Sequence, residues 1–308
     1  MHKYRRFSIK ASLLAVLTAV AVVAGSSAAQ AAATEGETES STAALLEKHA
    51  ALTEQLAQNQ YRRPLFLESS ETADHVSSIA YAVLDSPFSI VSATFKKPSR
   101  WCDILILHLN TKYCRANADT SPAALRVNIG KKMPQPLAET FALEFSYQVT
   151  ASTPNHLAVQ LHADKGPLST YNYRMALQAA PLPQGKTFIY FRYSYDYGLA
   201  GRLAMQTYLA TVGRGKVGFT QAPDESSGYI GGMRGTVERN TMRYYLAMEA
   251  YLASLRQAPE RQLNARLRHW FDATEEYSRQ LHELDLASYL AMKQDEYQRQ
   301  QATPAPAE

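Results

Sequence analysis

Residues 87–114, PFSIVSATFKKPSRWCDILILHLNTKYC, decide the fold of this chain. Phe88, Val91 and Phe95 follow a proline at helical spacing, which predicts a short helix because proline suits the first turn of a helix. A second short helix begins at Pro98, and the stretch ends in a strand pattern. We therefore expect two short helices in succession, with strands before and after them.

Prolines and glycines separate a series of strand patterns, and they are the turn signals of an antiparallel meander. The last pattern alternates strictly, so that Tyr193, Tyr195 and Tyr197 share one face and Arg192 lies on the other. One face of the sheet is therefore expected to be covered. The expected strands are residues 64–67, 76–84, 111–117, 125–131, 138–150, 156–163, 170–179 and 187–197.

A long helix with one apolar stripe, residues 233–256, is the expected cover. The order of strand, two short helices, antiparallel strands and long helix, with the motif Pro-x-x-Trp-Cys-x-Ile-Leu at 98–105, resembles the START-like branch of the SRPBCC superfamily. The resemblance covers residues 64–257 and implies an α+β helix-grip fold, a curved antiparallel sheet wrapped around a long C-terminal helix. An additional helix at 199–212 and the helical segment after Pro259 depart from the family pattern.

The resemblance also implies a cavity between sheet and long helix, which the family uses for lipids, sterols or polyketide-like molecules. Simple core packing is one interpretation of the many aromatic residues, and an apolar cavity with a few hydroxyl tips is the other. Arg192 becomes a polar anchor for a ligand's carboxylate or phosphate if a bulge reverses its register. The expected cavity wall is Phe141, Phe145, Tyr147, Tyr171, Tyr173, Phe191, Tyr193, Tyr195, Tyr244, Tyr245 and Met248.

No motif points to catalysis. The glycines of 213–218 match G-x-G-x-x-G by letter, but the pattern before them is helical and the pattern after them is a strand, the reverse of the dinucleotide-binding context. The histidines lack H-E-x-x-H spacing, and His108, between two leucines, is expected to be structural. A G-x-S-x-G nucleophile elbow is also missing from the sequence. We expect no catalytic residue, no metal and no cofactor.

The N-terminus predicts export. Residues 1–31 combine a basic stretch, an apolar run too short to span a membrane comfortably, and an A-x-A cleavage pattern, which together predict a signal peptide. These residues carry four of the 32 basic side chains and no acid, so removal leaves 28 basic against 28 acidic residues and no electrostatic case for nucleic acid. In a periplasmic or secreted protein, Cys102 and Cys114 are expected to form a disulfide, with two buried thiols as the alternative.

Helical segments flank the expected domain. A flexible leader at 32–41 precedes a helix at 42–60, and a second helical extension covers 259–298 before a disordered tail at 299–308. We favour an antiparallel pair of these two helices within a monomer over a dimer through 260–298, with order to Leu284 and fraying beyond Met292. The extension carries a heptad-like stripe of Leu263, Leu267, Trp270, Thr274, Tyr277, Leu281 and Leu284.

Three hypotheses of function follow. The first is an exported START-like protein that binds a lipid or other hydrophobic small molecule in a sheet–helix cavity, with transport of that molecule as an extension of the hypothesis, and we favour binding over enzymatic activity. The second is a cyclase- or aromatase-like enzyme on the same fold, since such chemistry needs only a few polar groups in an apolar pocket. The third is an interaction module in which residues 260–298 dock a partner.

Overall fold

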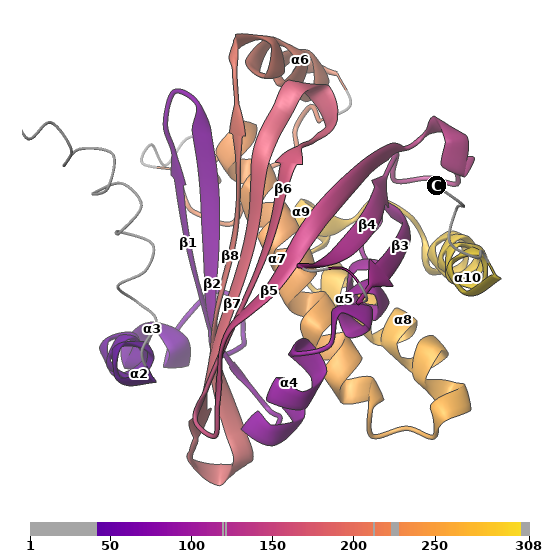
Figure 1. Ribbon diagram of the computed structural model, residues 1–308. Helices are drawn as coiled ribbons and strands as arrows, with labels where there is room; N and C mark the ends of the chain where they lie inside the picture. Colours follow the sequence, from indigo (N-terminus) through magenta and orange to yellow (C-terminus); the bar gives the residue numbers. More distant parts are fainter. Residues whose placement is uncertain (1–41, 119, 121, 212, 223–227, 303–308) are drawn as a thin grey trace, which may run out of the picture. The chain divides into compact units, whose positions relative to one another are not determined.

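The computed structural model describes residues 42–118, 120, 122–211, 213–222 and 228–302 (Figure 1). The predicted signal peptide at 1–31, the leader at 32–41 and residues 303–308 of the tail lie outside the described residues. The described chain is α+β, and its antiparallel strands form an eight-stranded sheet in the order β1-β2-β8-β7-β6-β5-β4-β3.

The strands and helices follow the expected order. The strands are β1 (Leu65–Glu71), β2 (His75–Leu84), β3 (Thr111–Asn117), β4 (Ala123–Ile129), β5 (Phe141–Thr153), β6 (His156–Lys165), β7 (Thr170–Leu182) and β8 (Lys186–Tyr197). The helices are α2 (Thr42–Ala51), α3 (Thr53–Ala57), α4 (Phe88–Phe95), α5 (Pro98–Leu105), α6 (Leu199–Ala210), α7 (Gly232–Ser254), α8 (Pro259–Glu275), α9 (Ser278–Leu281) and α10 (Leu286–Ala302). Single 3-10 turns are η1 (Leu137–Glu139), η2 (Pro167–Ser169) and η3 (Pro183–Gly185).

The two short helices determine how the sheet is assembled. The hairpin of β1 and β2 pairs with β8, the last strand of the chain, while β3 forms the opposite edge. The chain must therefore cross from one half of the sheet to the far edge between β2 and β3, and α4 and α5 make this crossing (Figure 1). Pro98 occupies the first turn of α5, as predicted.

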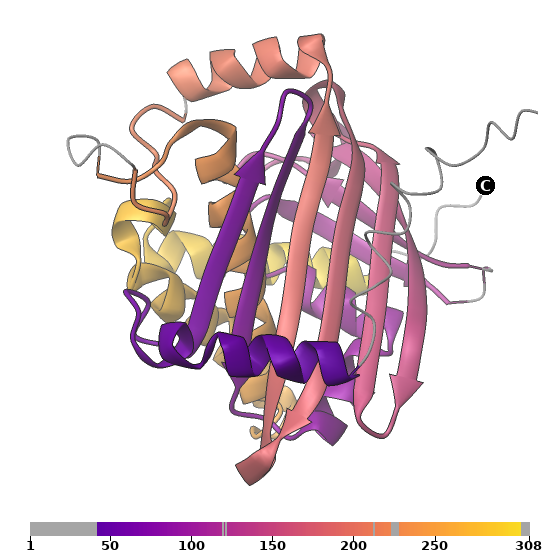
Figure 2. The same ribbon diagram turned by 90° about the vertical axis from the view of Figure 1, so that its left-hand side faces the viewer.

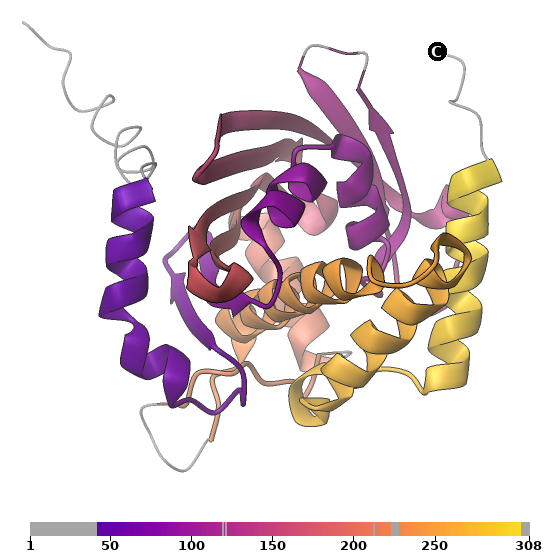
Figure 3. The ribbon, with the colours of Figure 1, turned by 90° about the horizontal axis from the view of Figure 1, so that it is seen from below.

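Helix α7 lies against the concave face of the curved sheet (Figures 1 and 3). The alternation predicted for β8 is present, because Phe191, Tyr193, Tyr195 and Tyr197 all lie in the core that the sheet shares with α7. The predicted helix-grip fold is therefore confirmed, with two short helices between β2 and β3 and a long C-terminal helix against the sheet. The additional helix expected near 199–212 is also present as α6.

A disulfide joins the second of the two short helices to the edge strand β3. Cys102 on α5 and Cys114 on β3 are bonded, with their Cα atoms 5.1 Å apart. The disulfide confirms the expected pairing and leaves no free cysteine in the chain that is described. It ties α5 to the edge strand that begins the meander, a connection that closes a short loop of the unfolded chain.

The predicted pairing of the N-terminal helix with the C-terminal extension is wrong. Helices α2 and α3 lie on the outer face of the sheet, on the side away from α7 and α8 (Figures 2 and 3). Their leucines pack there because this part of the outer face is aromatic rather than polar. The cluster consists of Leu45, Leu52, Leu56, Tyr81, Ala180, Phe188 and Tyr190.

The single C-terminal helix expected at 260–298 is three helices, and the expected fraying beyond Met292 is wrong. The residues of its heptad-like stripe are largely buried, but they pack against their own domain. The indole of Trp270 donates a hydrogen bond to the carbonyl of Arg243 on α7 at 3.0 Å. The chain turns after α8 and again after α9, so that it first covers α7 and then reaches β3. Helix α10 continues to Ala302, and residues 299–302 are therefore helical rather than part of a disordered tail.

A buried group of charges holds α10 to the edge of the sheet. Glu296 accepts hydrogen bonds from Lys112 on β3 at 2.9 Å and from Lys293 at 2.7 Å. Lys293 also donates to the backbone carbonyls of His108 and Thr111 at 2.7 and 2.8 Å. Both lysines are fully buried, and burial lowers the pKa of Lys293 to about 8 despite the nearby carboxylate.

Replacing the shared carboxylate should destabilise the protein in a pH-dependent way. We expect Glu296→Gln to lower the free energy of unfolding by about 3–5 kcal/mol at pH 7, because two buried ammonium groups lose their counter-ion. In the variant, the folded protein sheds a lysine proton that the unfolded chain keeps, so its stability should rise with pH. The difference in free energy of unfolding between variant and wild type, measured by urea titration, should therefore be smaller at pH 9 than at pH 7.

The matched control is Asp295→Asn, which removes an exposed carboxylate from the neighbouring position of the same helix. It should change the free energy of unfolding by no more than about 0.5 kcal/mol. Equal losses in the two variants, or a gap that is the same at both pH values, would contradict the assigned role of Glu296.

Candidate ligand site between the sheet and α7

Four tyrosines meet between the sheet and the long helix, and we call them the tyrosine cluster: Tyr173, Tyr193, Tyr195 and Tyr244. Tyr193 and Tyr195 are two residues apart on β8 and share its inner face, while Tyr244 projects from α7. The ring centres of Tyr193 and Tyr244 are 5.4 Å apart, and those of Tyr173 and Tyr195 are 5.1 Å apart. The cluster therefore joins both walls of the helix grip.

A bulge in β7 decides which tyrosine enters this cluster. The register between β7 and β8 shifts between Tyr171 and Arg174, and Asn172 adopts a left-handed conformation with φ of 51°. Tyr173 thereby lies inside, whereas Tyr171 is 42% exposed. The prediction that Tyr171 lines the interior is wrong for this reason.

The hydroxyl groups of the cluster differ in their hydrogen bonding. The hydroxyls of Tyr173 and Thr170 are 2.7 Å apart and form a hydrogen bond. Within the described part of the chain, no hydrogen bond is made by the hydroxyls of Tyr193, Tyr195 or Tyr244. Burial raises the pKa of all four tyrosines, that of Tyr173 to about 12, so these hydroxyls stay neutral at physiological pH.

Two further hydroxyls on the same inner surfaces lack a partner. The Oγ of Ser78 on β2 and the Oγ1 of Thr241 on α7 are buried without a hydrogen-bond partner among the described residues. Ser78 is the register partner of Tyr193 and therefore lies beside it on the sheet. Buried polar groups are usually paired, so these unpaired hydroxyls distinguish the interior from an ordinary core.

The rings of the cluster do not close completely around one another. Tyr173 and Tyr244 each keep 8% of their surface accessible and Tyr193 keeps 6%, whereas Tyr245, next along α7, keeps none. The rings of Tyr193 and Tyr244 meet at 66° and those of Tyr173 and Tyr193 at 47°. These rings are therefore buried slightly less completely than the neighbouring Tyr245.

His108 borders the cluster from the other side. Its ring stacks on Tyr244 with centres 4.8 Å apart, and its Nδ1 accepts a hydrogen bond from the backbone N–H of Asn110 at 3.1 Å. Burial, together with the positive charges of Arg243 and Lys293, holds its pKa well below the ordinary value. The imidazole is therefore neutral with its proton on Nε2, a donor next to the tyrosine rings.

Most of the predicted wall lies in the interior, but not all of it. Tyr147 is fixed by a hydrogen bond from its hydroxyl to the carbonyl of Phe95 at 2.7 Å, and Tyr245 is buried with its hydroxyl turned to Glu249 at 2.6 Å. Phe141 is 40% exposed at the start of β5, so its predicted place in the wall is wrong. The other buried members are Phe145, Tyr173, Phe191, Tyr193, Tyr195, Tyr244 and Met248.

Arg192 faces away from the interior, and the prediction of an inner polar anchor at this position is wrong. The pairing of β8 with β2 runs without a register shift from His75 to Leu84, so no bulge turns Arg192 inward. Its guanidinium lies 3.5 Å from Nε2 of His75, whose Nδ1 is 2.5 Å from the carboxylate of Asp196. This polar group lies on the outer face.

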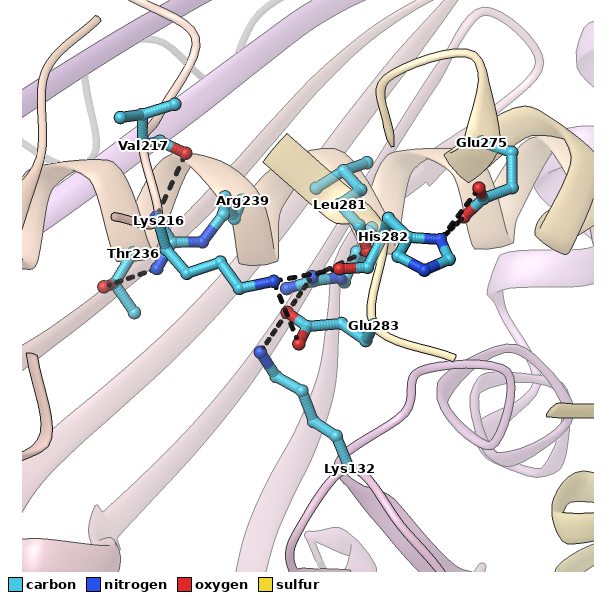
Figure 4. A network of polar contacts seen from close by, with 10 residues as sticks. Lys132, Lys216, Val217, Thr236, Arg239, Glu275, Leu281, His282 and Glu283 are labelled. Atoms are coloured by element: carbon cyan, nitrogen blue, oxygen red, sulfur yellow. Dashed lines mark hydrogen bonds and ion pairs between the residues drawn. The ribbon is translucent and has the colours of Figure 1, made fainter. Parts of the chain in front are cut away.

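Sequence reasoning missed a charged group beside α7, which we call the Glu283 cluster: Glu283, Lys132, Lys216 and Arg243 (Figure 4). The carboxylate of Glu283 accepts hydrogen bonds from Lys132 and Arg243, the latter at 3.0 Å, and pairs with Lys216 at 3.3 Å. These four residues come from four separate segments of the chain, so no sequence spacing could connect them. Burial alone would raise the pKa of Glu283, but Lys132 and Arg243 hold it below its ordinary value.

Two surface hollows of about 250 Å³ lie outside the helix grip. One lies beneath α2 and is lined by Leu45, Lys48, Tyr81 and Tyr190. The other is lined by Arg63, Glu249, Arg256 and His269. Both are smaller than the usual site for a drug-sized ligand. Within the described ranges, no helix is both long and apolar enough to cross a membrane, and no cluster of three metal-ligating side chains occurs.

Comparisons with known proteins find likeness only to solved structures, and at low sequence identity. No family model matches the chain, and no curated protein matches it. Among solved structures, human StAR-related lipid transfer protein 5 is 11% identical over 70% of this chain and 100% of its own, with a TM-score of 0.36. A conserved protein from Geobacillus kaustophilus is 12% identical over 58% and 95%, with a TM-score of 0.34. The human StarD13 (DLC2) lipid transfer and protein localization domain is 10% identical over 51% and 88%, with a TM-score of 0.28.

The helix-grip fold rests on this chain's own strand order, on the two crossing helices and on the position of α7 against the sheet. The site within the fold is described by this chain's own side chains: tyrosine hydroxyls inside the grip and cations around Glu283.

The depressed pKa of Glu283 makes an acid-dependent contribution to stability. Its ionised form stabilises the folded state above pH 4.5, and this contribution should be lost as the pH falls through the lower folded-state value. We expect Glu283→Gln to lower the free energy of unfolding by about 1–3 kcal/mol at pH 7 and by clearly less at pH 3.5. Urea titrations at the two pH values measure the gap.

The control is Glu139→Gln, at an exposed carboxylate in the turn before β5. A surface change of this kind should shift stability by less than about 0.5 kcal/mol. If Glu283→Gln lowers the free energy of unfolding by the same amount at pH 7 and at pH 3.5, the three cations do not stabilise the ionised form of Glu283 as assigned.

Proposed function

We propose that this protein binds a lipid or other hydrophobic small molecule between the concave face of the sheet and α7, and that it carries this molecule after export to a periplasmic or extracellular compartment. The observation that supports binding is the set of hydroxyls without a hydrogen-bond partner among the described residues, between the concave face of the sheet and α7: those of Ser78 and Thr241 and of the tyrosine cluster except Tyr173. The signal-peptide pattern of residues 1–31 supports export.

The surroundings of the tyrosine cluster suit an apolar ligand body. Phe191, Met175 and Met248 are at most 2% exposed, and the aliphatic residues of β6 and α7 complete the same core. An apolar ligand that enters this region loses contact with water at roughly 25 cal/mol per Å² of buried surface. The interior therefore favours a molecule that is mainly hydrocarbon or aromatic.

The hydroxyls indicate that the ligand also carries a polar group. An unsatisfied buried hydroxyl costs about 1–3 kcal/mol, and a ligand oxygen or nitrogen that pairs with it recovers much of this free energy. Ser78 on β2 and Thr241 on α7 supply two such groups, one from each wall. A ligand with one carbonyl, hydroxyl or ester beside its apolar part is therefore the best match.

A cyclase- or aromatase-like enzyme is the second candidate, and His108 is the observation that bears on it. The imidazole lies beside the tyrosine rings, but its Nδ1 is occupied and its low pKa keeps it neutral. Such a group orients a ligand by donating a hydrogen bond, and it is a poor general acid near neutral pH. Binding is therefore the stronger proposal.

The helical interaction module receives less support. The apolar stripe of α8 is occupied within the chain, since Leu267 and Trp270 are 1% exposed and α8 packs along α7. A helix that already buries its stripe in its own domain offers little apolar surface to a partner.

The binding proposal predicts different effects for tyrosines with and without hydrogen-bond partners. Tyr193→Phe and Tyr244→Phe each remove an unpaired hydroxyl without changing ring shape, so stability should be equal or higher. Affinity for a bound lipid should fall about tenfold for each, which corresponds to roughly 1.4 kcal/mol. The measurements are urea titration and displacement of NBD-labelled phospholipid and sterol probes.

The matched control is Tyr289→Phe, since its buried hydroxyl donates to the carbonyl of Leu107 at 3.1 Å, away from the cluster. That variant should lose about 1 kcal/mol of stability and keep the affinity. The proposal fails if the purified chain yields no apolar molecule on extraction and mass spectrometry and takes up none of the probes.

A further inference from the structure

The Glu283 cluster joins the two sides of the helix grip. Lys132 lies in the loop that follows β4, and Lys216 lies in the segment between α6 and α7. Arg243 projects from α7 itself, and Glu283 lies in the short link between α9 and α10 (Figure 4). One carboxylate thus connects a loop of the sheet to the helix that the sheet grips.

This charged cluster is a neighbour of the tyrosine cluster. Arg243 directly precedes Tyr244 on α7, and its positive charge opposes the burial that raises the pKa of the Tyr244 hydroxyl. Arg243 and Lys132 both act electrostatically on His108, whose ring stacks on Tyr244. Arg243 and Lys132 therefore act electrostatically on residues that form or border the tyrosine cluster.

The cations surround a position that suits an oxyanion. Three positively charged side chains share the single carboxylate of Glu283, and both of its oxygens are engaged. The site is partly open, since the side chains of Lys216 and Lys132 are 28% and 20% exposed, while that of Arg243 is buried. Guanidinium and ammonium groups bind the oxygens of carboxylates and phosphates in the same manner.

Glu283 is able to leave this position without unfolding a helix. Residues 282–285 connect the end of α9 at Leu281 to the start of α10 at Leu286. A link of this kind changes its backbone angles more easily than a helix interior, because fewer hydrogen bonds are broken. Lys216 also lies outside helices and strands, so it can follow a new partner.

We propose that Lys132, Lys216 and Arg243 bind the anionic end, a carboxylate or phosphate, of an amphiphile whose apolar part lies among the tyrosines, and that Glu283 occupies this position until the ligand displaces it. This inference rests on the proposed function and specifies its ligand class. The carboxylate of Glu283 both holds the two sides of the grip together and competes with the ligand.

The test compares two probes that differ only at one end: pyrene-labelled hexadecanoic acid and pyrene-labelled hexadecanol, titrated at pH 7.5 into the full chain. The acid should bind about tenfold more tightly than the alcohol, a difference of roughly 1.4 kcal/mol. Glu283→Gln removes the competing carboxylate and should tighten binding of the acid about tenfold while leaving the alcohol unchanged.

A second variant keeps the proposal testable if Glu283→Gln does not fold. Lys216→Met removes the most exposed of the three cations and should weaken binding of the acid about tenfold, again without effect on the alcohol. The control is Glu68→Gln, which removes a carboxylate that pairs with Lys48 at 3.5 Å on the outer side of the sheet. It should change neither affinity.

The outcomes separate this inference from the proposed function. Equal affinities for acid and alcohol, or weaker acid binding by Glu283→Gln, would overturn the anionic-end assignment and leave the hydrophobic site standing. Competition by inorganic phosphate with no binding of either chain-bearing probe would show a site for free anions and overturn the amphiphile. If neither pyrene-labelled probe binds and inorganic phosphate does not bind either, both proposals are wrong.

Discussion

Burial of α7 on all its sides is the constraint on which the rest of the structure depends. The concave face of the sheet covers one side of this helix, but 17 of its 23 residues are buried, more than one sheet face can hide. Helix α8 covers the opposite side and brings Trp270 against the backbone of Arg243. The C-terminal extension is therefore the second half of the enclosure for α7, which explains why it follows directly after that helix.

This enclosure forces polar groups of α7 into the interior, and the chain satisfies them unequally. Glu238 is fully buried, yet its carboxylate accepts hydrogen bonds from the backbone N–H groups of Phe219 and Thr220 and from Ser69. Arg243 reaches Glu283 and the carbonyl of Leu281. Against this background the hydroxyl of Tyr244 has no such partner, although it arises from the same helix. The hydroxyl of Thr241 on the same helix likewise has no hydrogen-bond partner among the described residues.

The parts of the fold that sequence could predict are those that depend on local period. Patterns of residues close together in the chain predict the alternation in β8, the proline-led helices α4 and α5, and the long helix α7. The placement of Tyr171 failed because one residue, Asn172, adopts a left-handed conformation and shifts the register there. No periodic pattern contains that information, since a bulge inserts one residue without changing the residue types around it.

Long-range partners were predicted less well, because the choice depends on surfaces that exist only in the folded sheet. The leucines of α2 fit several apolar surfaces, and the aromatic patch of Tyr81, Phe188 and Tyr190 on the outer face became available only once β2 and β8 were paired. The Glu283 cluster is the extreme case, with Lys132 and Glu283 separated by 151 positions.

In the proposed binding mode, the interior and the Glu283 cluster form one binding site. A grip that is held closed only by apolar contacts would admit any hydrophobic molecule, since such contacts carry little directional information. Three cations gathered on a carboxylate supply direction, and this carboxylate offsets part of their positive charge when no ligand is bound. An incoming anion must then replace the interactions that Glu283 makes with the three cations. The same interactions therefore set both the stability of the ligand-free protein and its selectivity for the ligand.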